Sequence, residues 1–512
     1  MNKNILLIMT DQQRSDYTGY IADGKASMPN LDALARTSAY FTCCQTTNPI
    51  CMPARSSLIT GRYPRQIGAL TMSGDLFPQI PTFMHGLQKA GYTTYGIGKF
   101  HYLQTAPWSV PRGQGLNYVK MAAASCDSKQ YGYDEIWEAA GKQLMLKNYC
   151  YYADCLHEKG LLEKARDFWQ QSGGPNGDTA DHNYDQVRSW PFDEADYPDV
   201  MIGLKAREKI KTHDRKKPFF MFLSFCGPHK PYDAPRRYLD MVEYEEKDDF
   251  ILEANKTLST EEKDIIYRQR HSAKAMLRLI DDQIGMTLDE LKKQNMFEDS
   301  LIIFTSDHGD MLGDHYMIQK GVPWRQSVNV PLVIKMPGME PSGAHNAPVE
   351  LSDIAATILD YAGLKPDAAL SRPWPAYNDR IPSRSLLPIV RGTSDKIRDF
   401  AFSESDFTEE RKPGAVYKEV LEKRGGGGRR TNAWQAVTTD KSKYIKYTEY
   451  ERPGDVYEEF YDLVNDRNET INQIKNPAYR RKIREARNRL RYILDRYPPC
   501  QMTWADGWMG QA

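Results

Sequence analysis

The chain has 512 residues and a mass of 58.8 kDa, which suits one large core with an appended subdomain, or two domains. Its 68 basic and 68 acidic residues give a formal net charge of +0, so binding of nucleic acid or of a membrane surface is not expected of the chain as a whole. No apolar run approaches the ~20 residues of a membrane-spanning helix. The eight cysteines contain no Cys-x-x-Cys pair, which argues against a zinc finger.

The N-terminus carries a short apolar segment, residues 5–9, that runs directly into Asp11. This segment is too short for the apolar region of a secretory signal peptide, and no small-residue cleavage site follows it. We therefore interpret residues 5–9 as the first core strand of a cytoplasmic protein.

Short apolar runs then alternate with amphipathic segments along the chain. The expected strands are residues 5–9, 93–97, 219–225, 301–305 and 330–334. Helices are expected from about Leu31 with Asn30 as cap, through Phe83, Leu87 and Ala90 up to Gly91, and along residues 276–288, where one face is apolar. The alternation predicts an α/β fold with a large, mostly parallel sheet sandwiched by helices.

Two regions interrupt this alternation. Residues 105–199 are rich in Tyr, Trp, Gly and charge, and we interpret them as an insertion over the active-site face. Beyond the glycine run at 425–428, a β-rich stretch at 433–447 and a basic helix at about 479–496 indicate a smaller α+β subdomain. An apolar stripe on that helix should face a core, so its arginines are interpreted as a solvated face rather than a nucleic-acid surface. The expected division is a large domain of residues 1–395 and a subdomain of residues 396–512.

Residues suited to metal binding or proton transfer follow four of the predicted strands. They are Asp11, Lys99 with His101, His229, and Asp307 with His308. Because ligands of open α/β sheets bind beyond the carboxyl ends of the strands, these side chains should converge. Two carboxylates and an imidazole suit one divalent cation, although Asp307-His308-Gly309-Asp310 alone is as typical of a polar turn.

One cysteine lies in a distinctive local pattern, Cys51-x-Pro53-x-Arg55 followed by Leu58-x-Thr60-Gly61. An isolated cysteine is ordinarily a buried structural residue. The whole pattern, however, resembles the signature by which type I sulfatases, members of the alkaline phosphatase superfamily, mark one cysteine for oxidation to formylglycine by a maturation enzyme. The hydrated aldehyde would carry two hydroxyls, one to attack sulfur and one to expel the sulfated group afterwards.

The resemblance extends over nearly the whole chain outside residues 105–199. Its landmarks, in the order that this family shows, are Asp11, Cys51, 98–101, 228–231, 306–310, Lys320, 349–359 and 460–463. It implies an alkaline-phosphatase-like fold and hydrolysis of a small-molecule or saccharide sulfate ester. The oligomeric state is left open.

The resemblance also implies a role for each matching residue. The metal ligands would be Asp11, Asp307, His308 and an oxygen of the formylglycine made from Cys51, with Ca²⁺ as the expected ion and Mg²⁺ or Mn²⁺ as alternatives. Arg55 would hold the formylglycine hydrate, Lys99 and Lys320 would bind the sulfuryl oxygens, His101 would be the base, His229 the proton donor, and Gln12 a further substrate-binding residue. Lysines aimed at these oxygens stabilise charge already spread over them, and imidazole suits a general base near neutral pH.

Two positions depart from the commonest family pattern. Gln12 stands where a second aspartate is frequent, and His308 where asparagine is frequent. This combination also resembles formylglycine-dependent phosphonate monoester and phosphodiester hydrolases, which are the alternative function. A second alternative is a non-catalytic binding protein with unmodified Cys51, disfavoured because every polar element of the family site is present. A two-zinc phosphatase is disfavoured because no further Asp-His cluster accompanies Asp307.

Overall fold

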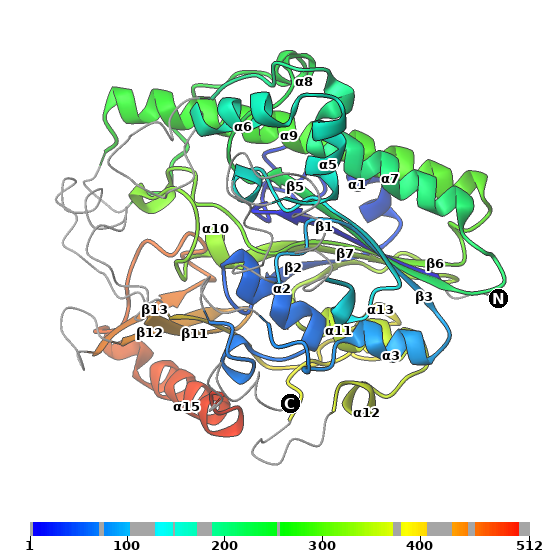
Figure 1. Ribbon diagram of the computed structural model, residues 1–512. Coiled ribbons are helices and arrows are strands. Elements are labelled where there is room, and N and C mark those ends of the chain that lie inside the picture. Colours follow the sequence, from blue (N-terminus) through cyan, green and yellow to red (C-terminus); the bar gives the residue numbers. More distant parts are fainter. Residues whose placement is uncertain are drawn as a thin grey trace, which may run out of the picture.

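The computed structural model describes residues 4–70, 76–102, 128–146, 149–171, 187–252, 257–371, 380–406, 433–448 and 456–500. Within them, a large sheet has helices on both faces, and a smaller sheet lies beside it (Figure 1). The strand order across the large sheet is β4-β3-β5-β1-β6-β7-β2-β8, and β9 also pairs with β2. In chain order the strands are β1 (Asn4–Asp11), β2 (Ala39–Gln45), β3 (Thr93–Gly98), β4 (Glu135–Glu138), β5 (Phe219–Pro228), β6 (Ser300–Ser306), β7 (Asn329–Lys335), β8 (Gly343–His345) and β9 (Val349–Glu350).

All five predicted strands are present, as β1, β3, β5, β6 and β7, and the predicted mostly parallel sheet is confirmed. The neighbours β4, β3, β5, β1 and β6 are mutually parallel, whereas β7 runs antiparallel to both β6 and β2. The strands β2, β4, β8 and β9 were not predicted. The last two are very short, and β2 carries Thr42 and Cys43 where a buried strand would be apolar.

The apolar runs are continuous because both faces of the sheet are covered. On β1, Leu6 and Ile8 pack into one core cluster, and Ile5, Leu7 and Met9 pack into another. Helices that contribute to the first cluster are α1 (Pro29–Arg36), α5 (Tyr151–Glu158), α6 (Leu162–Gln171), α7 (Pro198–Thr212), α8 (Arg236–Met241) and α9 (Thr260–Lys293). Helices that contribute to the second are α2 (Cys51–Thr60), α3 (Phe83–Lys89), α11 (Asp353–Tyr361), α12 (Pro366–Leu370) and α13 (Leu387–Val390).

The predicted helices are present, with one wrong cap. Helix α9 buries the expected apolar face, and α3 ends at Lys89, just before Ala90 and Gly91. Helix α1 begins at Pro29, so Asn30 is not its cap. Instead, the backbone N–H groups of Asn30 and Leu31 donate to the carboxylate of Asp281 on α9, at 3.0 and 2.9 Å. A remote carboxylate thus satisfies amide groups that a local side chain usually caps.

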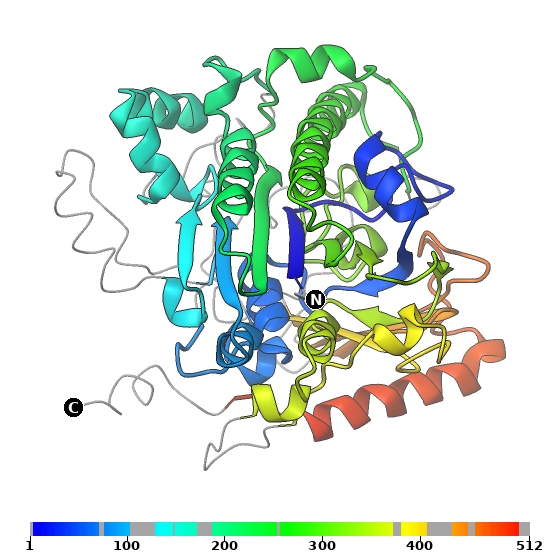
Figure 2. The same ribbon diagram turned by 90° about the vertical axis from the view of Figure 1, so that its right-hand side faces the viewer.

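The described part of residues 105–199 extends the large sheet. Strand β4 lies beside β3 at the sheet edge, with α5 and α6 nearby (Figure 2). Tyr152 and Trp169 of these helices are fully buried in the first core cluster. The interpretation of the whole region as an insertion stays a prediction.

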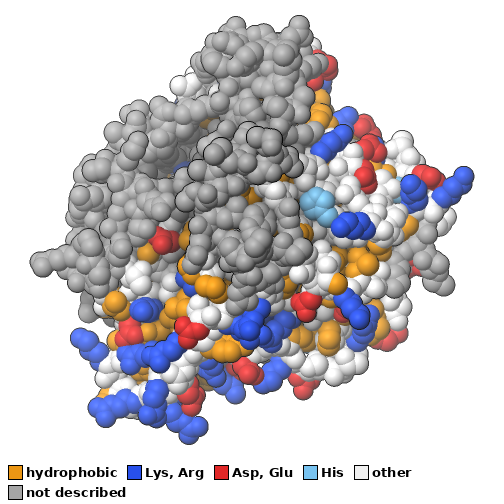
Figure 3. Space-filling view, turned by 60° about the horizontal axis from the view of Figure 1, so that its bottom comes forward, with side chains coloured by type: hydrophobic (Ala, Val, Ile, Leu, Met, Phe, Trp, Pro, Cys, Tyr) orange, Lys and Arg blue, Asp and Glu red, His pale blue; other side chains and the backbone are white. Residues whose placement is uncertain are grey.

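The smaller sheet is antiparallel, in the order β10 (Ala401–Asp406), β11 (Ala433–Thr438), β12 (Ser442–Thr448) and β13 (Val456–Asp462). Helix α15 (Arg480–Arg496) packs on it through Ile483, Ala486, Leu490 and Ile493, which confirms the predicted α+β unit. Lys and Arg side chains gather at the lower left of Figure 3, where the exposed face of α15 lies. The glycine run at 425–428 lies outside the described residues. The boundary at residue 395 stays a prediction. None of the helices in the described ranges is long and apolar enough to cross a membrane.

Candidate active site

The site lies where four neighbouring parallel strands end. Strand β1 ends at Asp11, β3 is followed by Lys99 and His101, β5 by His229, and β6 by Asp307 and His308. Since β3, β5, β1 and β6 are adjacent and parallel, their carboxyl ends share one edge of the sheet. The side chains that the sequence placed at strand ends are therefore brought together, as expected.

Helix α2 supplies Cys51 from the other side of this edge. Cys51 is the first residue of the helix, and Arg55 lies one turn later on the same face. The helix ends at Gly61, whose φ of 64° is left-handed and whose N–H donates to the carbonyl of Ser57 at 2.9 Å. A Cβ on Gly61 would also lie 2.9 Å from Leu370 Cδ1, a side-chain end that can move, so the left-handed backbone is the main reason for the glycine of the signature.

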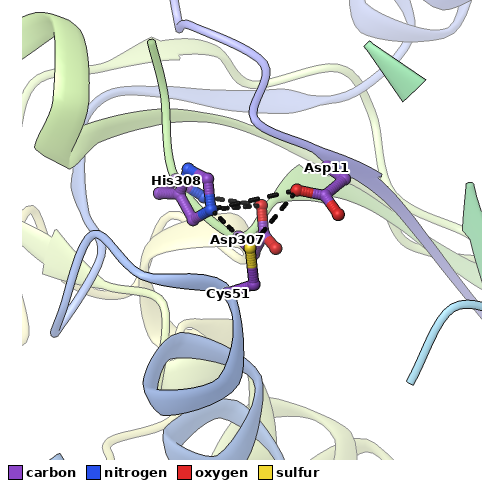
Figure 4. Close-up of side chains that lie close together, drawn as sticks. All are labelled: Asp11, Cys51, Asp307 and His308. Carbon is purple, nitrogen blue, oxygen red and sulfur yellow. Dashed lines mark hydrogen bonds and ion pairs between the residues drawn. The ribbon is translucent and has the colours of Figure 1, made fainter. Parts of the chain in front are cut away.

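Four buried side chains form the centre of the site, namely Asp11, Cys51, Asp307 and His308 (Figure 4). One ligand atom from each lies within 4.8 Å of the others. Cys51 Sγ lies 3.1 Å from His308 Nε2 and 3.7 Å from Asp11 Oδ1, and His308 Nε2 lies 3.6 Å from Asp307 Oδ1. These are the residues predicted to hold a metal.

The donor set fits a divalent cation. His308 donates its Nδ1–H to the carbonyl of Gly309 at 3.0 Å, which leaves the Nε2 lone pair directed at the cluster. Asp11 and Asp307 each use Oδ2 to pair with a basic residue, so their Oδ1 atoms face the centre. A carbonyl-oriented imidazole and two anchored carboxylates are suitable first ligands for Mn²⁺, Mg²⁺ or Ca²⁺.

Arg55 holds the carboxylates in place and is fully buried. Its Nε donates to Asp307 Oδ2 at 2.8 Å, and its Nη1 donates to the carbonyl of Lys99 at 2.6 Å and to Ser224 Oγ at 2.9 Å. Burial alone would lower the pKa of Arg55, but Asp307 and Asp11 raise it above its usual value. Arg55 is therefore a permanent cation beside Cys51.

Two lysines lie near Cys51. Lys99 pairs with Asp11 Oδ2, and although burial opposes its charge, Asp11 and Cys51 raise its pKa to about 12. Lys320 Nζ lies 3.3 Å from Cys51 Sγ and donates to Gln12 Oε1 at 2.6 Å. Burial raises the pKa of the Cys51 thiol, but Lys320, Lys99 and His308 outweigh that effect and hold it well below its usual range.

Gln12 is oriented by a residue that the sequence did not single out. Its Nε2 donates to Asp310 Oδ2, which also accepts from the hydroxyl of Tyr232 at 2.9 Å. The other oxygen of Asp310 accepts from the backbone N–H of Gln319 at 2.7 Å. With its amide held in this way, Gln12 presents Oε1 to Lys320.

Asp310, Tyr232 and Ser224 were missed as site residues. Asp310 belongs to the Asp307-His308-Gly309-Asp310 motif, and that membership was the available signal. Tyr232 and Ser224 carried no sequence signal, because their contacts join segments 78 and 169 residues apart.

Both predicted proton-transfer residues are neutral imidazoles near neutral pH. His101 is 5% exposed, and neither of its ring nitrogens has a hydrogen-bond partner among the described residues. Burial lowers its pKa. His229 donates its Nδ1–H to the carbonyl of Lys230 at 2.8 Å, while burial and the charge of Lys320 lower its pKa to about 4.

Two of these residues have a strained backbone. Gln12 and His101 have φ angles of 70° and 56°, in the left-handed region that side chains other than glycine rarely adopt. Such conformations cost about 1–3 kcal/mol each and are retained mainly at functional sites. Both strained residues follow a strand end and point into the site.

Comparisons with known proteins agree with this geometry. The sequence model of the sulfatase family matches residues 3–364. The chain is 26% identical over 511 residues to an arylsulfatase of Clostridium perfringens, covering 94% of this chain and 92% of the relative. It is 28% identical over 416 residues to a choline-sulfatase of Rhizobium meliloti, covering 76% and 72%. The crystal structure of a phosphonate monoester hydrolase of Agrobacterium radiobacter superposes with a TM-score of 0.73 at 22% identity, covering 97% of this chain and 96% of that one.

The family match spans well over half of the chain, and the fold is that of the solved relatives. The chain belongs to the sulfatase family, within the alkaline phosphatase superfamily. It is a sulfuric ester hydrolase, as the sequence predicted, and its substrates are sulfate esters. The family implies a metal ion and formylglycine.

Proposed function

We propose that the chain hydrolyses a sulfate ester to an alcohol and inorganic sulfate through a formylglycine made from Cys51, with one divalent metal ion. The observation that carries the proposal is the surroundings of Cys51. Its sulfur lies within 3.7 Å of a carboxylate oxygen, an imidazole nitrogen and an ammonium group. A structural cysteine would lie among apolar side chains instead.

In this proposal Cys51 Sγ stands in for an oxygen of the hydrated aldehyde, whose two hydroxyls serve for attack and for later release of sulfate. The metal would be held by Asp11, Asp307, His308 and that oxygen. When bound, it would polarise the ester and lower the pKa of the attacking hydroxyl. The position of residue 51 at the N-terminus of α2 also favours negative charge there.

The sulfuryl group would bind to Lys99 and Lys320, whose charges both act on residue 51. Their partners, Asp11 and Gln12, hold both ammonium groups in place before substrate arrives. Preorganised cations of this kind stabilise the charge of the transition state without reorganising during the reaction.

His101 is proposed as the base that takes a proton from the second hydroxyl. Burial lowers the pKa of its ring, and the ring interacts with Cys51, which supports this role because a general base must hold a free lone pair at the working pH.

His229 is proposed as the donor to the leaving alcohol. Its pKa of about 4 means that it must take up a proton when substrate binds. The negative charge of a sulfate ester close to the ring would raise that pKa, since a nearby opposite charge favours the imidazolium.

The substrate is proposed to be a small-molecule or saccharide sulfate ester. The test compares kcat/KM for an aryl sulfate with kcat/KM for an aryl phosphonate monoester and an aryl phosphodiester, on one preparation whose residue 51 has been checked by peptide mass. Cys51→Ala is the control. A ratio well above one that disappears in Cys51→Ala supports the sulfatase.

A second candidate is a phosphonate monoester or phosphodiester hydrolase. Gln12 beside Lys320, and His308 in the metal position, are the features that favour it. A ratio well below one in the same experiment would assign the chain to this activity and reject the first proposal.

A further inference from the structure

We propose that the chain with unoxidised Cys51 is a zinc-thiolate protein, and that oxidation of Cys51 changes the metal preference of the site from zinc to harder cations. The zinc site would consist of Cys51 Sγ, His308 Nε2, Asp11 Oδ1 and Asp307 Oδ1. The first half of the inference concerns the chain as translated, and only the second half rests on the proposed conversion to formylglycine.

Four of the six distances among these atoms are close to the edges of a tetrahedral zinc site, and all four ligand atoms lie within 4.8 Å of one another. Zinc bonds of about 2.3 Å to sulfur and about 2.0–2.2 Å to nitrogen and oxygen give tetrahedral edges of roughly 3.4–3.6 Å. The corresponding distances are 3.1 Å from Sγ to Nε2, 3.7 Å from Sγ to Asp11 Oδ1, 3.8 Å from Nε2 to Asp11 Oδ1 and 3.6 Å from Nε2 to Asp307 Oδ1. Small side-chain adjustments would therefore complete the tetrahedron.

Three of the four ligands are already oriented by a neighbouring group. The Gly309 carbonyl fixes the His308 tautomer, Lys99 holds Asp11, and Arg55 holds Asp307. Asp307 Oδ1 also accepts the backbone N–H groups of Gln12 and His308, at 3.0 and 2.9 Å. Such outer partners are what maintain ligand geometry in metal sites.

The charges also suit a zinc thiolate. A thiolate and two carboxylates carry three negative charges, so their complex with a divalent ion has a net charge of −1. Lys320 lies 3.3 Å from the sulfur, and Arg55 and Lys99 contact the carboxylates, so cations surround the anionic complex. Binding would release the thiol proton as the zinc–sulfur bond forms.

The sulfur atom is what decides the preference. Thiolate and imidazole ligands select zinc, whereas carboxylate and water oxygens suit Ca²⁺, Mg²⁺ and Mn²⁺. With sulfur present the set is one S, one N and two O, and with the formylglycine oxygen it becomes one N and three O. A single change at residue 51 therefore alters the hardness of the whole site.

The experiment uses full-length chain produced without a maturation enzyme, with Cys51 verified by peptide mass and bound metals removed. Zn²⁺ affinity is measured by competition with a chromophoric chelator, and Co²⁺ serves as a spectroscopic probe for a thiolate-to-cobalt charge-transfer band. Cys51→Ser replaces sulfur by oxygen at the same position. Cys43→Ser is the matched control, because it removes a half-buried thiol outside the cluster.

The expected result is one Zn²⁺ per chain and a charge-transfer band in the unconverted protein and in Cys43→Ser. Because loss of an outer-shell partner alone costs about 10- to 100-fold in affinity, Cys51→Ser should bind Zn²⁺ about 100-fold more weakly and lack the band, without weaker binding of Mn²⁺. Equal Zn²⁺ affinity in Cys51→Ser, or no band in the unconverted chain, would overturn the inference. The band needs no variant, so the test holds even where a variant fails to fold. Since no turnover is measured, its outcome is independent of the sulfate-to-phosphonate ratio.

Discussion

Asp310 is expected to control activity without touching the substrate. It holds the Nε2 of Gln12, so that Oε1 of the same amide accepts from Lys320 at 2.6 Å. In Asp310→Asn the side-chain NH₂ can take the place of the carboxylate oxygen that accepts from Gln12. The NH₂ groups of residues 310 and 12 would then face each other as two donors. The favourable response is a flip of the Gln12 amide, which turns its NH₂ toward the Lys320 ammonium.

The magnitude follows from the bond that is lost. A hydrogen bond to a charged group is worth about 1.5–3 kcal/mol, which corresponds to a loss of about 10- to 100-fold in kcat/KM. Tyr232→Phe removes a neutral donor from the same carboxylate without creating a donor pair. It should cost only about 0.5–1.5 kcal/mol, or less than about tenfold.

The assay is kcat/KM for an aryl sulfate on preparations with equal conversion of residue 51, alongside the melting temperature. A folded Asp310→Asn enzyme with wild-type kcat/KM would refute this reasoning.

Three further predictions concern proton donation, the metal and acid stability. His229→Gln should lower kcat for an alkyl sulfate by about 10²- to 10⁴-fold and much less for an aryl sulfate with a good leaving group, and equal losses would exclude His229 as donor. Chelation should abolish turnover and lower the melting temperature, because the Oδ1 atoms of Asp11 and Asp307 then face each other without the metal ion between them. Metal analysis should return one divalent ion per chain, and an active metal-free chain would contradict the site. Burial raises the pKa of Asp16, but Arg14 outweighs this and holds it below its usual value. The stability from this pair is therefore complete above the unfolded pKa of about 4 and lost as pH falls, so Asp16→Asn should cost about 3 kcal/mol at pH 7 in urea unfolding and progressively less toward pH 3.

The fold could be predicted wherever one local pattern decides the structure. Strands such as β1 are apolar on both faces because both are covered, and the resulting run is visible in the sequence. The antiparallel direction of β7 cannot be predicted from the residues of β7 alone, because it depends on which strands β7 pairs with. The cap of α1 was wrong for the same reason, since Asp281 lies about 250 residues away.

Some residues of the candidate site could likewise be predicted from local sequence, and others could not. Residues directly after parallel strands could be found, because a shared sheet edge brings them together whatever the intervening loops do. Asp310 and Tyr232 could not be assigned, because their contact with Gln12 depends on the path of two loops. The sequence therefore predicts the atoms that would do chemistry better than the atoms that orient them.

Of the two departures from the common family pattern, the one at position 12 changes the charge of the site. A second aspartate at position 12 would neutralise Lys320, whereas Gln12 holds the ammonium through a neutral oxygen and leaves its charge for the substrate. His308 in place of asparagine exchanges one neutral ligand for another, so the change in charge comes from position 12 alone. A site with this charge favours monoanionic tetrahedral esters. Sulfate esters, phosphonate monoesters and phosphodiesters all carry one negative charge, so the charge of the site favours all three classes of ester equally. Discrimination among the three must come from the central sulfur or phosphorus atom and from the leaving group.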